Sequence, residues 1–451
     1  MKDVAIIGAG LTGLTLAFLL KKQGYNVIVL EKADRVGGAI QTHIYEGYVF
    51  EEGPNTGVVS NPEVAELFEM LGCNIETAND SAEKRLILKN HQWHPLPSGA
   101  ISFMKTPLFT AADKIRILFE PLRKKGTDPD ESVASLAARR IGQSFVDYAV
   151  NPFISGIYAG DPEQLTTRYA LPKLYNLEQD YGSFIGGGFK KSRQKKTERD
   201  KKASRKVFSV YGGLRKLIDL LEEKTGKESI ICDAQQIRIG KKDENYEISY
   251  LKDNECERIA AKTVISTIGA YALPEILPFI PKSDMDRITK LNYAKIVQVA
   301  VALKENSLDP KYISFGGLIP KKENRNLLGV LFPSYCFSDR SPDNCSTLAV
   351  YLGGVKHPEL FDLSDDNLRS LVLKELEELF DIPAPSVLFT KIFRHPYAIP
   401  QYDKWSGDRF DTIKKIEAEY PGLIIAGNLR NGIGMSDRIK QAFDIADQLK
   451  R

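Results

Sequence analysis

The chain has 451 residues, too many for one compact core and enough for two or three subdomains. Hydrophobic residues make up 43%, charged residues 27%, and the net charge is +3, so the composition is that of a globular protein and favours no class of partner. The 5 cysteines form no CxxC pair and the 5 histidines no HxxxH pair, which argues against a metal site and indicates free thiols in a reducing compartment.

The first apolar segment begins at Val4, which leaves no room for a signal peptide. No apolar run approaches the roughly 18 residues that span a bilayer. We therefore expect a cytoplasmic protein, and any membrane contact should be peripheral, at the inner face of the membrane.

The chain opens with a predicted strand, a glycine-rich turn, a helix and a second strand, the order of a Rossmann unit. The strands are residues 4–7 and 27–30, and the GxGxxG glycines are Gly8, Gly10 and Gly13. Such glycines allow a tight turn, a close approach of backbone to pyrophosphate and close packing of helix on strand. Glu31 ends the second strand, where it can accept hydrogen bonds from both hydroxyls of an adenosine ribose. The sequence therefore predicts a dinucleotide-binding domain.

The residues after Glu31 distinguish a flavin from a nicotinamide dinucleotide. They continue as ExxxRxGG, with Arg35, Gly37 and Gly38. A second glycine pair lets backbone contact the long chain of an extended FAD, and Arg35 can reach a phosphate, whereas an NAD domain needs nothing here. This double motif resembles the FAD-binding signature of the flavin amine oxidase superfamily, to which the protoporphyrinogen oxidases belong. The resemblance implies FAD as the cofactor.

Three further segments resemble protoporphyrinogen oxidases in particular. They read NPFISGIYAGDP at 151–162, PKLYNLEQDYGS at 172–183 and AIPQY at 398–402. From the residues alone, the first is a loop with two glycines and the second an aromatic-rich helix. General amine oxidases and phytoene desaturases lack these two segments. With the two ends, the resemblance covers essentially the whole chain.

The resemblance implies an α/β fold in three parts: a discontinuous Rossmann-like FAD-binding domain, an antiparallel-sheet substrate domain and a helical domain. The expected boundaries are 1–84, 205–290 and 401–451 for the FAD-binding domain, 85–109 and 291–400 for the substrate domain, and 110–204 for the helical domain. The helical domain is the candidate for membrane association.

The implied FAD-binding residues come from all three segments of the FAD-binding domain. They are Gly8, Ala9, Gly10, Leu11, Thr12, Gly13, Glu31, Lys32, Arg35, Gly37, Gly38, Ala39, Gly53, Pro54, Asn55, Thr56, Gln236, Gly427, Asn428, Ile433, Gly434 and Met435. The Gly53-Pro54-Asn55 loop is expected along the flavin ring. Gln236 falls in a strand predicted over 230–239, where relatives usually have valine, so only its backbone is expected to contact adenine.

The predicted helix that opens at 432–437 should direct its positive N-terminus at the flavin pyrimidine edge. No cysteine follows Cys345, which excludes the cysteinyl–flavin link of monoamine oxidases at that end and implies non-covalent FAD. No Ser/His/Asp set, carboxylate pair or metal cluster is present, so no side chain is predicted to be catalytic and the flavin carries the chemistry.

The implied substrate-binding residues are Arg85, Asn55, Phe337, Leu318 and Gly156. Arg85 heads an apolar strand of a predicted hairpin, where an arginine is either a carboxylate-binding fork or a solvated strand end. The resemblance favours pairing with a substrate propionate. For Phe337 and Leu318 the alternative to a substrate contact is core packing.

The implied activity is FAD-dependent oxidation of protoporphyrinogen IX to protoporphyrin IX in haem biosynthesis, with loss of six electrons. Oxygen would accept them to form hydrogen peroxide, and another acceptor is an alternative. Oxidation of coproporphyrinogen III to coproporphyrin III is the close alternative for the substrate; a flavin amine oxidase and a non-catalytic FAD-binding module are more distant ones.

Residues 190–206 hold ten Lys or Arg and two acids. We expect a solvated flexible loop there, with contact to anionic lipid as the alternative and no nucleic-acid partner, because the segment lacks interleaved aromatic residues. The sequence leaves a homodimer open.

Overall fold

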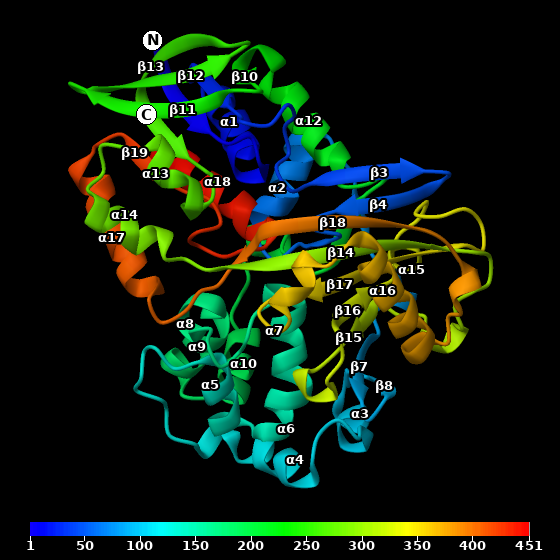
Figure 1. Ribbon diagram of the computed structural model, residues 1–451. Helices are drawn as coiled ribbons and strands as arrows, with labels where there is room; N and C mark the ends of the chain where they lie inside the picture. Colours follow the sequence, from blue (N-terminus) through cyan, green and yellow to red (C-terminus); the bar gives the residue numbers. More distant parts are fainter. Residues whose placement is uncertain (451) are drawn as a thin grey trace.

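The computed structural model describes residues 1–450 and has two large sheets and a helical lobe (Figure 1). The strands of the first sheet are β1 Lys2–Ile7, β2 Val27–Leu30, β10 Ile230–Ile231, β11 Gln235–Lys242, β12 Asn245–Lys252, β13 Glu255–Ser266 and β19 Leu423–Ile425. They lie in the order β10-β2-β1-β13-β12-β11, with β19 also paired to β13. The pairs among β10, β2, β1, β13 and β19 are parallel, while β11 and β12 are antiparallel.

Helices cover both faces of this sheet. One face is covered by α1 Leu11–Lys22, α2 Pro62–Leu71, α12 Arg215–Thr225 and α18 Met435–Gln448, and the other by α13 Leu273–Ile276, α14 Lys282–Thr289 and α17 Ser406–Glu419. Alternate side chains of a strand point to opposite faces, so Val4 and Ile6 of β1 enter one core while Ala5 and Ile7 enter the other. The predicted α/β class is confirmed.

Two small sheets join this part to the rest. They are the hairpin β3 Gln41–Tyr45 with β4 Tyr48–Glu52, and the three strands β5 Gly57–Val58, β9 Val207–Val210 and β6 Ile75–Thr77. β9 is the strand by which the chain returns from the helical lobe, and it pairs with both β5 and β6.

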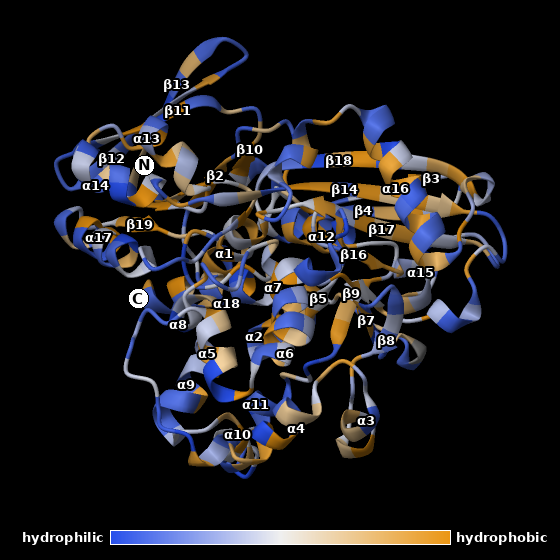
Figure 2. Cartoon of the chain, turned by 60° about the horizontal axis from the view of Figure 1, so that its bottom comes forward, coloured by the Kyte–Doolittle hydropathy of each residue, from blue (hydrophilic) through white to orange (hydrophobic). Residues whose placement is uncertain are grey.

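The second large sheet has the order β18-β14-β17-β16-β15-β7-β8. Its strands are β18 Val387–Pro400, β14 Tyr293–Leu303, β17 Ser346–Gly353, β16 Leu327–Leu331, β15 Gly316–Leu318, β7 Arg85–Lys89 and β8 Gln92–Pro95. All pairs are antiparallel except β15 with β7. Val297, Val299 and Val301 of β14 pack beneath helix α16, Asp365–Phe380, and Figure 2 shows these strands in the hydrophobic colour.

The helical lobe lies below the second sheet in Figure 1. Its helices are α3 Ala100–Lys105, α4 Ala111–Leu118, α5 Val133–Arg140, α6 Gln143–Phe145, α7 Asn151–Tyr158, α8 Thr167–Ala170, α9 Pro172–Tyr181, α10 Phe184–Ser192 and α11 Glu198–Lys201. Helical structure dominates here, as predicted. The division of the chain into three domains with the boundaries above stays a prediction.

Two sequence-based expectations are wrong. Residues 230–239 do not form one strand: the chain turns between β10 and β11, where Asp233 has φ +58°, and Gln236 within β11 has φ +50°. The segment 151–162 is not a loop, because residues 151–158 form α7, and Pro152 follows the π-helical turn at 146–150 that joins α6 to α7. The helix ends at Ala159, in the left-handed region with φ +47°.

No helix among residues 1–450 is long and apolar enough to cross a membrane.

Candidate flavin and substrate site

The GxGxxG turn leaves an open cradle at the N-terminus of α1. Gly8 has φ +101°, and a Cβ on Gly13 would lie 2.0 Å from the Gly8 carbonyl oxygen, so the helix packs directly on the turn. A Cβ on Gly10, in contrast, would meet nothing within 4 Å. Helix α1 has no side-chain N-cap and no acid in its first turn. Its N–H groups are therefore available to an anion such as a diphosphate.

The second glycine pair folds back onto the first motif. The Gly37 amide donates to the Ala9 carbonyl at 2.8 Å, and a Cβ on Gly38 would lie 3.3 Å from Gly10 Cα. The Arg35 Nη1 donates to the Gly38 carbonyl at 3.2 Å, which keeps its guanidinium beside the pair. The two motifs thus form one surface, as an extended dinucleotide requires.

Glu31 lies where an adenosine ribose is expected. Its carboxylate accepts hydrogen bonds from the amides of Ala9 at 2.7 Å and Ala33 at 2.9 Å. A carboxylate has about four lone-pair positions, so acceptor capacity remains for ribose hydroxyls. The Asp233 amide donates to the Ala33 carbonyl at 2.8 Å, which holds the turn before β11 next to Glu31. Gln236 lies in the bulge of β11 that follows, outside its pairing register with β12.

These residues fit FAD, by the open cradle at Gly10 and the unfilled acceptor sites of Glu31. Bound there, FAD would supply a flavin ring that can accept hydride. The role of each predicted contact residue stays a prediction.

The Gly53-Pro54-Asn55 loop is fastened to the second sheet. Gly53 has φ +90°, and a Cβ there would lie 2.2 Å from the Ala39 carbonyl oxygen. Its amide donates to Gln298 Oε1 at 3.2 Å, and the Asn55 amide lies 2.6 Å from the Tyr351 hydroxyl. The sequence reading missed Gln298 and Tyr351. The signal was a glutamine inside the apolar strand β14, because a buried polar side chain needs a partner.

Glu51, on the strand that leads into this loop, is also a residue that the sequence reading missed. It is 4% exposed and accepts hydrogen bonds from the Leu214 amide at 2.8 Å and the Thr42 hydroxyl at 2.7 Å. Burial raises the pKa of Glu51 to about 7, against the opposing effect of these hydrogen bonds. The carboxyl group therefore ties the β3–β4 hairpin to the start of α12.

The buried side chain of Arg438 holds the backbone of the C-terminal part of the predicted cofactor site. Its Nη2 donates to the carbonyls of Arg430, Asn431 and Gly432 at 2.8–3.0 Å, and Nη1 to Gln441 Oε1 at 2.8 Å. Burial lowers the pKa of Arg438. These bonds fold the chain that leads from Gly427 to the start of α18.

A carboxylate closes the N-terminus of α18. The Gly434 amide donates to Asp437 Oδ2 at 3.1 Å. This negative charge offsets part of the positive helix end that we expected at the flavin pyrimidine edge. Asp437 is three residues after the N-cap Gly434, a position from which a side chain can reach back to the N-cap amide.

Three of the predicted substrate residues share one face of the second sheet or border it. Arg85 and Ile87 are two residues apart on β7 and so share one face, and Ile87 is opposite Leu318 on β15. Ile87 packs with Phe109 and Tyr148 of the helical lobe, so this face is turned to the lobe. Gly156 of α7 meets it there, because a Cβ on Gly156 would lie 2.5 Å from Leu318 Cδ2.

Asn55 approaches the same face from the flavin side, through its hydrogen bond with Tyr351. Tyr351 is opposite Gly329, which is opposite Leu318. The structure thus brings Asn55, Leu318, Gly156 and Arg85 to one face, although their roles toward a substrate stay predictions.

Phe337 lies elsewhere. It is 2% exposed and packs in a small cluster with Ala82 and Cys336, and the Arg340 guanidinium lies 5.4 Å from its ring centroid. Arg85 is linked to this cluster through Phe315, whose ring centroid lies 5.0 Å from the Arg85 guanidinium. In this arrangement Phe337 makes core contacts, the alternative that the sequence left open.

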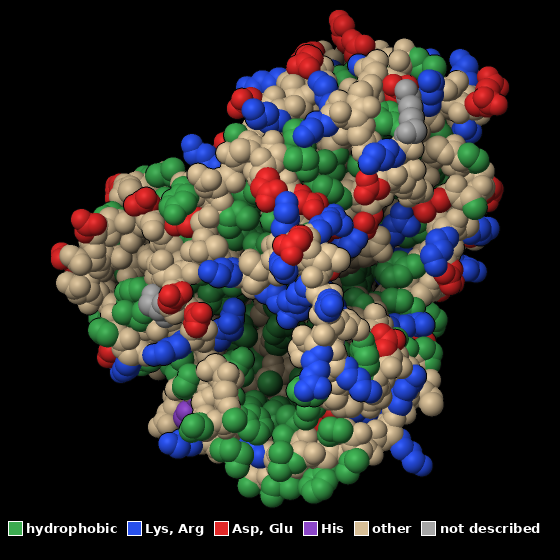
Figure 3. All heavy atoms as spheres, turned by 180° about the vertical axis from the view of Figure 1, so that it is seen from behind, with side chains coloured by type: hydrophobic (Ala, Val, Ile, Leu, Met, Phe, Trp, Pro, Cys, Tyr) green, Lys and Arg blue, Asp and Glu red, His purple; other side chains and the backbone are tan. Residues whose placement is uncertain are grey.

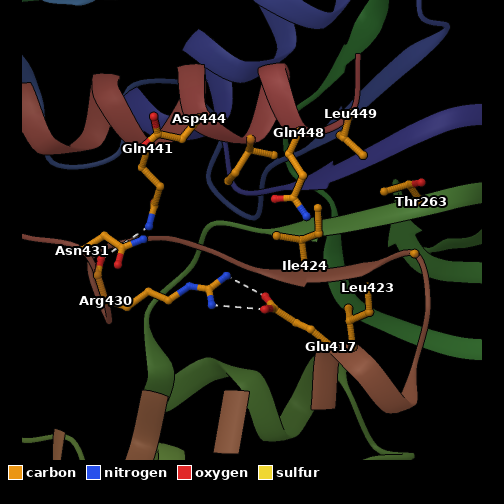
Figure 4. Close-up of a pocket in the computed structure, with 12 residues that line it drawn as sticks. Thr263, Glu417, Leu423, Ile424, Arg430, Asn431, Gln441, Asp444, Gln448 and Leu449 are labelled. Carbon is orange, nitrogen blue, oxygen red and sulfur yellow. Dashed lines mark hydrogen bonds and ion pairs between the residues drawn. The ribbon is translucent and has the colours of Figure 1, made fainter. Parts of the chain in front are cut away.

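A cavity of about 400 Å³ lies apart from this site, beside β19 and between α17 and α18 (Figure 4). Figure 4 shows the Arg430 guanidinium directed at the Glu417 carboxylate, and their hydrogen bonds are 2.6 and 3.2 Å long. None of the predicted cofactor or substrate residues lines this cavity.

Comparison with known proteins extends the resemblance over the whole chain. Residues 11–437 match the family described as flavin containing amine oxidoreductase. The chain is 31% identical over 478 residues to protoporphyrinogen oxidase 2, chloroplastic/mitochondrial, of Arabidopsis thaliana, covering 99% of this chain and 93% of the relative. It is 26% identical to the coproporphyrinogen III oxidase of Bacillus subtilis, covering 98% and 96%.

Solved structures show the same fold. A crystal structure from Exiguobacterium sp. 255-15 that carries the name protoporphyrinogen oxidase superposes with a TM-score of 0.82 at 23% identity, covering 100% of this chain and 98% of that one. Reduced UDP-galactopyranose mutase gives a TM-score of 0.74 at 16% identity, covering 100% and 94%. The chain belongs to the family of flavin-containing amine oxidoreductases.

Proposed function

We propose that the protein is an oxidase that uses FAD to convert a porphyrinogen to a porphyrin, with protoporphyrinogen IX as the preferred substrate and oxygen as the electron acceptor. The observation that supports this most is the 31% identity with a protoporphyrinogen oxidase over 99% of the chain. The relatives named protoporphyrinogen oxidase include enzymes of Nicotiana tabacum that also match over 99% of this chain.

The substrate-side face of the second sheet suits an apolar macrocycle with few carboxylates. Half-buried Leu318 gives it an apolar surface, and Arg85 stands at its end with an exposed side chain. The Arg85 side chain is exposed and its guanidinium lies 5.0 Å from the Phe315 ring centroid, where it can bind a propionate. Protoporphyrinogen IX has two propionates on one edge, whereas coproporphyrinogen III has four around the ring.

The direct test is steady-state turnover of both porphyrinogens side by side, followed by porphyrin fluorescence. We expect a higher kcat/KM for protoporphyrinogen IX, with hydrogen peroxide formed as oxygen is consumed. A higher kcat/KM for coproporphyrinogen III would favour the alternative, which the 26% identity with the Bacillus subtilis enzyme supports. Failure to oxidise either compound would contradict the proposal.

The contact to the carboxylate can be tested separately. A charge-assisted hydrogen bond contributes about 1.5–3 kcal/mol, so Arg85→Ala should raise KM for protoporphyrinogen roughly ten- to a hundredfold, with a smaller change in kcat. Arg85→Lys should restore part of this, since the fork geometry is lost. Lys84→Ala, the neighbouring exposed cation, is the matched control and should leave KM unchanged.

We further propose that the helical lobe contacts an anionic membrane surface. Several large apolar side chains project from α3, α4 and α10 and the turn after α4, and Figure 3 shows hydrophobic side chains gathered at the lower end of the molecule. These residues, which we call the apolar tip, are Ile101, Met104, Ile115, Leu118, Phe119, Leu122, Ile185 and Phe189. Leu122 is 81% exposed and Leu118 73% exposed, so together they would gain from burial in lipid.

Liposome flotation tests this contact. The wild-type protein should float with vesicles that contain anionic lipid, and the double variant Leu118→Glu/Leu122→Glu should remain at the bottom of the gradient. The double variant Ile44→Glu/Leu388→Glu, at two exposed apolar residues of β3 and β18 outside the helical lobe, is the control for two added charges. Equal flotation of all three proteins would show that the apolar tip is not the contact.

A further inference from the structure

Two polar side chains of the second sheet hold the loop that is predicted to lie along the flavin. Gln298 and Tyr351 are opposite each other on β14 and β17, and Gln298 is 1% exposed in a mostly apolar strand. A buried glutamine is costly unless both ends of its amide are hydrogen-bonded. Here Nε2 donates to the Glu51 carbonyl at 2.6 Å and Oε1 accepts from the Gly53 amide at 3.2 Å. Gln298 therefore fixes the backbone of the loop.

Tyr351 acts on the side chain that this loop presents. The Asn55 amide is 7% exposed, and its Nδ2 lies 2.6 Å from the Tyr351 hydroxyl and 3.5 Å from the Gly53 carbonyl. A carbonyl can only accept, so Nδ2, the donor end, is the end that belongs between these two oxygens. The opposite end, Oδ1, is then left as an acceptor.

The same row of residues leads to the predicted substrate wall. Tyr351 is opposite Gly329, and Gly329 is opposite Leu318. Neighbouring strands lie about 4.8 Å apart, which puts Tyr351 about 10 Å from Leu318 across a glycine. A macrocycle of that width that lies on Leu318 thus reaches the Asn55 amide. The pyrrole N–H groups of a porphyrinogen point into the centre of the ring, and because its sp³ bridges pucker the ring, they can donate from one face to a free amide oxygen.

We propose that Tyr351 is a positioning residue for porphyrinogen oxidation: its hydroxyl holds the Asn55 amide so that Oδ1 faces the pyrrole N–H groups. This inference rests on the proposed function. The hydroxyl does not touch the substrate in this arrangement, and its effect passes through Asn55.

The test is Tyr351→Phe, which keeps the ring and removes the hydroxyl. One neutral hydrogen bond is lost, so kcat for the porphyrinogen should fall about three- to tenfold while KM changes by less than about twofold. In an Asn55→Ala background the same substitution should have no further effect on kcat, because the residue through which it acts is gone. Tyr246→Phe is the matched control: that hydroxyl is also buried and donates to the Tyr420 and Pro421 carbonyls, remote from the loop, and kcat should be unchanged.

Equal losses of kcat in the wild-type and Asn55→Ala backgrounds would overturn the proposal, since they would show a structural role independent of Asn55. So would a change in KM alone. If the wild-type protein oxidises neither porphyrinogen, the proposed function fails. The contact between Tyr351 and the Asn55 loop is then tested by the visible absorption spectrum of the FAD-loaded protein. A shifted flavin absorption band in Tyr351→Phe but not in Tyr246→Phe then supports the contact between Tyr351 and the loop, and identical spectra overturn it.

Discussion

Strand β4, which leads into the loop beside the predicted flavin, buries Glu51, and the helical lobe buries Glu120. The groups that bond the two carboxyls differ. Glu51 is 4% exposed and is bonded by one backbone amide and one hydroxyl, with no cation in a salt bridge. Glu120, 0% exposed, is bonded by the Arg140 guanidinium at 2.8 Å and by Ser183 at 2.6 Å. Both carboxyls are shielded from solvent, and their hydrogen-bond partners differ.

The pKa values of Glu51 and Glu120 shift in opposite directions because their hydrogen-bond partners differ. Burial raises the pKa of Glu51 to about 7. Burial also acts to raise the pKa of Glu120, but hydrogen bonds from Ser183, the Phe184 amide and Arg140 bring it below its ordinary value. The helical lobe is therefore organised around a buried charge, whereas the hairpin holds a carboxyl group that is neutral below about pH 7.

The largest expected effect comes from removing the cation of the lobe. Arg140 is 0% exposed and bonds both Glu120 and Glu178, so Arg140→Met leaves a buried carboxylate unpaired. Breaking a buried pair from one side costs about 3–5 kcal/mol. We expect that loss in the free energy of unfolding, measured by denaturant titration, and rapid proteolysis within 110–204.

The control is Arg168→Met, which removes an ion pair with Asp130 whose side chains are 31% and 43% exposed. An exposed pair contributes about 0–1 kcal/mol. Equal destabilisation by the two variants would contradict the view that a buried charge organises the lobe.

The second prediction concerns the pH dependence of stability at Glu51. Its pKa is raised in the folded state, so the folded protein binds more protons than the unfolded chain between the ordinary value of 4.5 and about 7. Stability therefore falls as pH rises through that window, by about 3 kcal/mol for this group. In Glu51→Gln this loss of stability should be absent. The stability of the variant relative to the wild type, measured by thermal unfolding, should therefore rise as the pH increases from 4.5 to 7.5.

Glu46→Gln, in the exposed turn of the same hairpin, should keep the wild-type slope. The lobe gives the opposite sign, because the pKa of Glu120 is lowered and its contribution is lost as the pH falls. A Glu51→Gln variant that keeps the wild-type pH profile would show that Glu51 is charged in the fold.

The sequence predicts correctly the features that depend on the backbone of neighbouring residues. The turn at Gly8 and the packing at Gly13 depend on residues close in the chain, so their spacing predicts their geometry. It failed where side chains meet from distant segments. Arg140 meets Glu178 across 38 residues, and Gln298 meets Glu51 across 247. Nothing in the local pattern of either residue names its partner, although a polar residue in an apolar strand shows that one is needed.

Gly10 and Gly13 belong to one motif but differ in the space around them. A Cβ on Gly13 would lie 2.0 Å from the Gly8 carbonyl oxygen, whereas a Cβ on Gly10 would meet nothing within 4 Å. Gly13→Ala should therefore cost about 1–3 kcal/mol of stability by overpacking and lose FAD as a result. Gly10→Ala should leave the Tm of the FAD-free protein unchanged and weaken only FAD binding. Thermal unfolding without FAD and FAD retention on gel filtration separate the two, and equal Tm losses would contradict this.

The smallest expected effect concerns the basic segment 190–206. The sequence reading favoured a solvated flexible loop, but residues 198–201 form α11, and Arg199 bonds Glu63 and Glu66 of α2 at 2.9 and 2.8 Å. Lys202 likewise pairs with Glu69 at 2.6 Å. Part of the positive charge is thus neutralised by α2, while Lys190 and Lys191, on α10 beside the apolar tip, have no ion pair within the described residues.

The two groups of cations should therefore behave differently. A lysine near an anionic surface contributes about 1 kcal/mol, so Lys190→Gln/Lys191→Gln should reduce liposome flotation, most clearly at low salt. Arg199→Gln/Lys202→Gln removes the same formal charge but should leave flotation nearly unchanged, because both cations are already paired with carboxylates of α2. If both double variants lose flotation equally, net charge alone decides binding and the pairing with α2 has no influence on it.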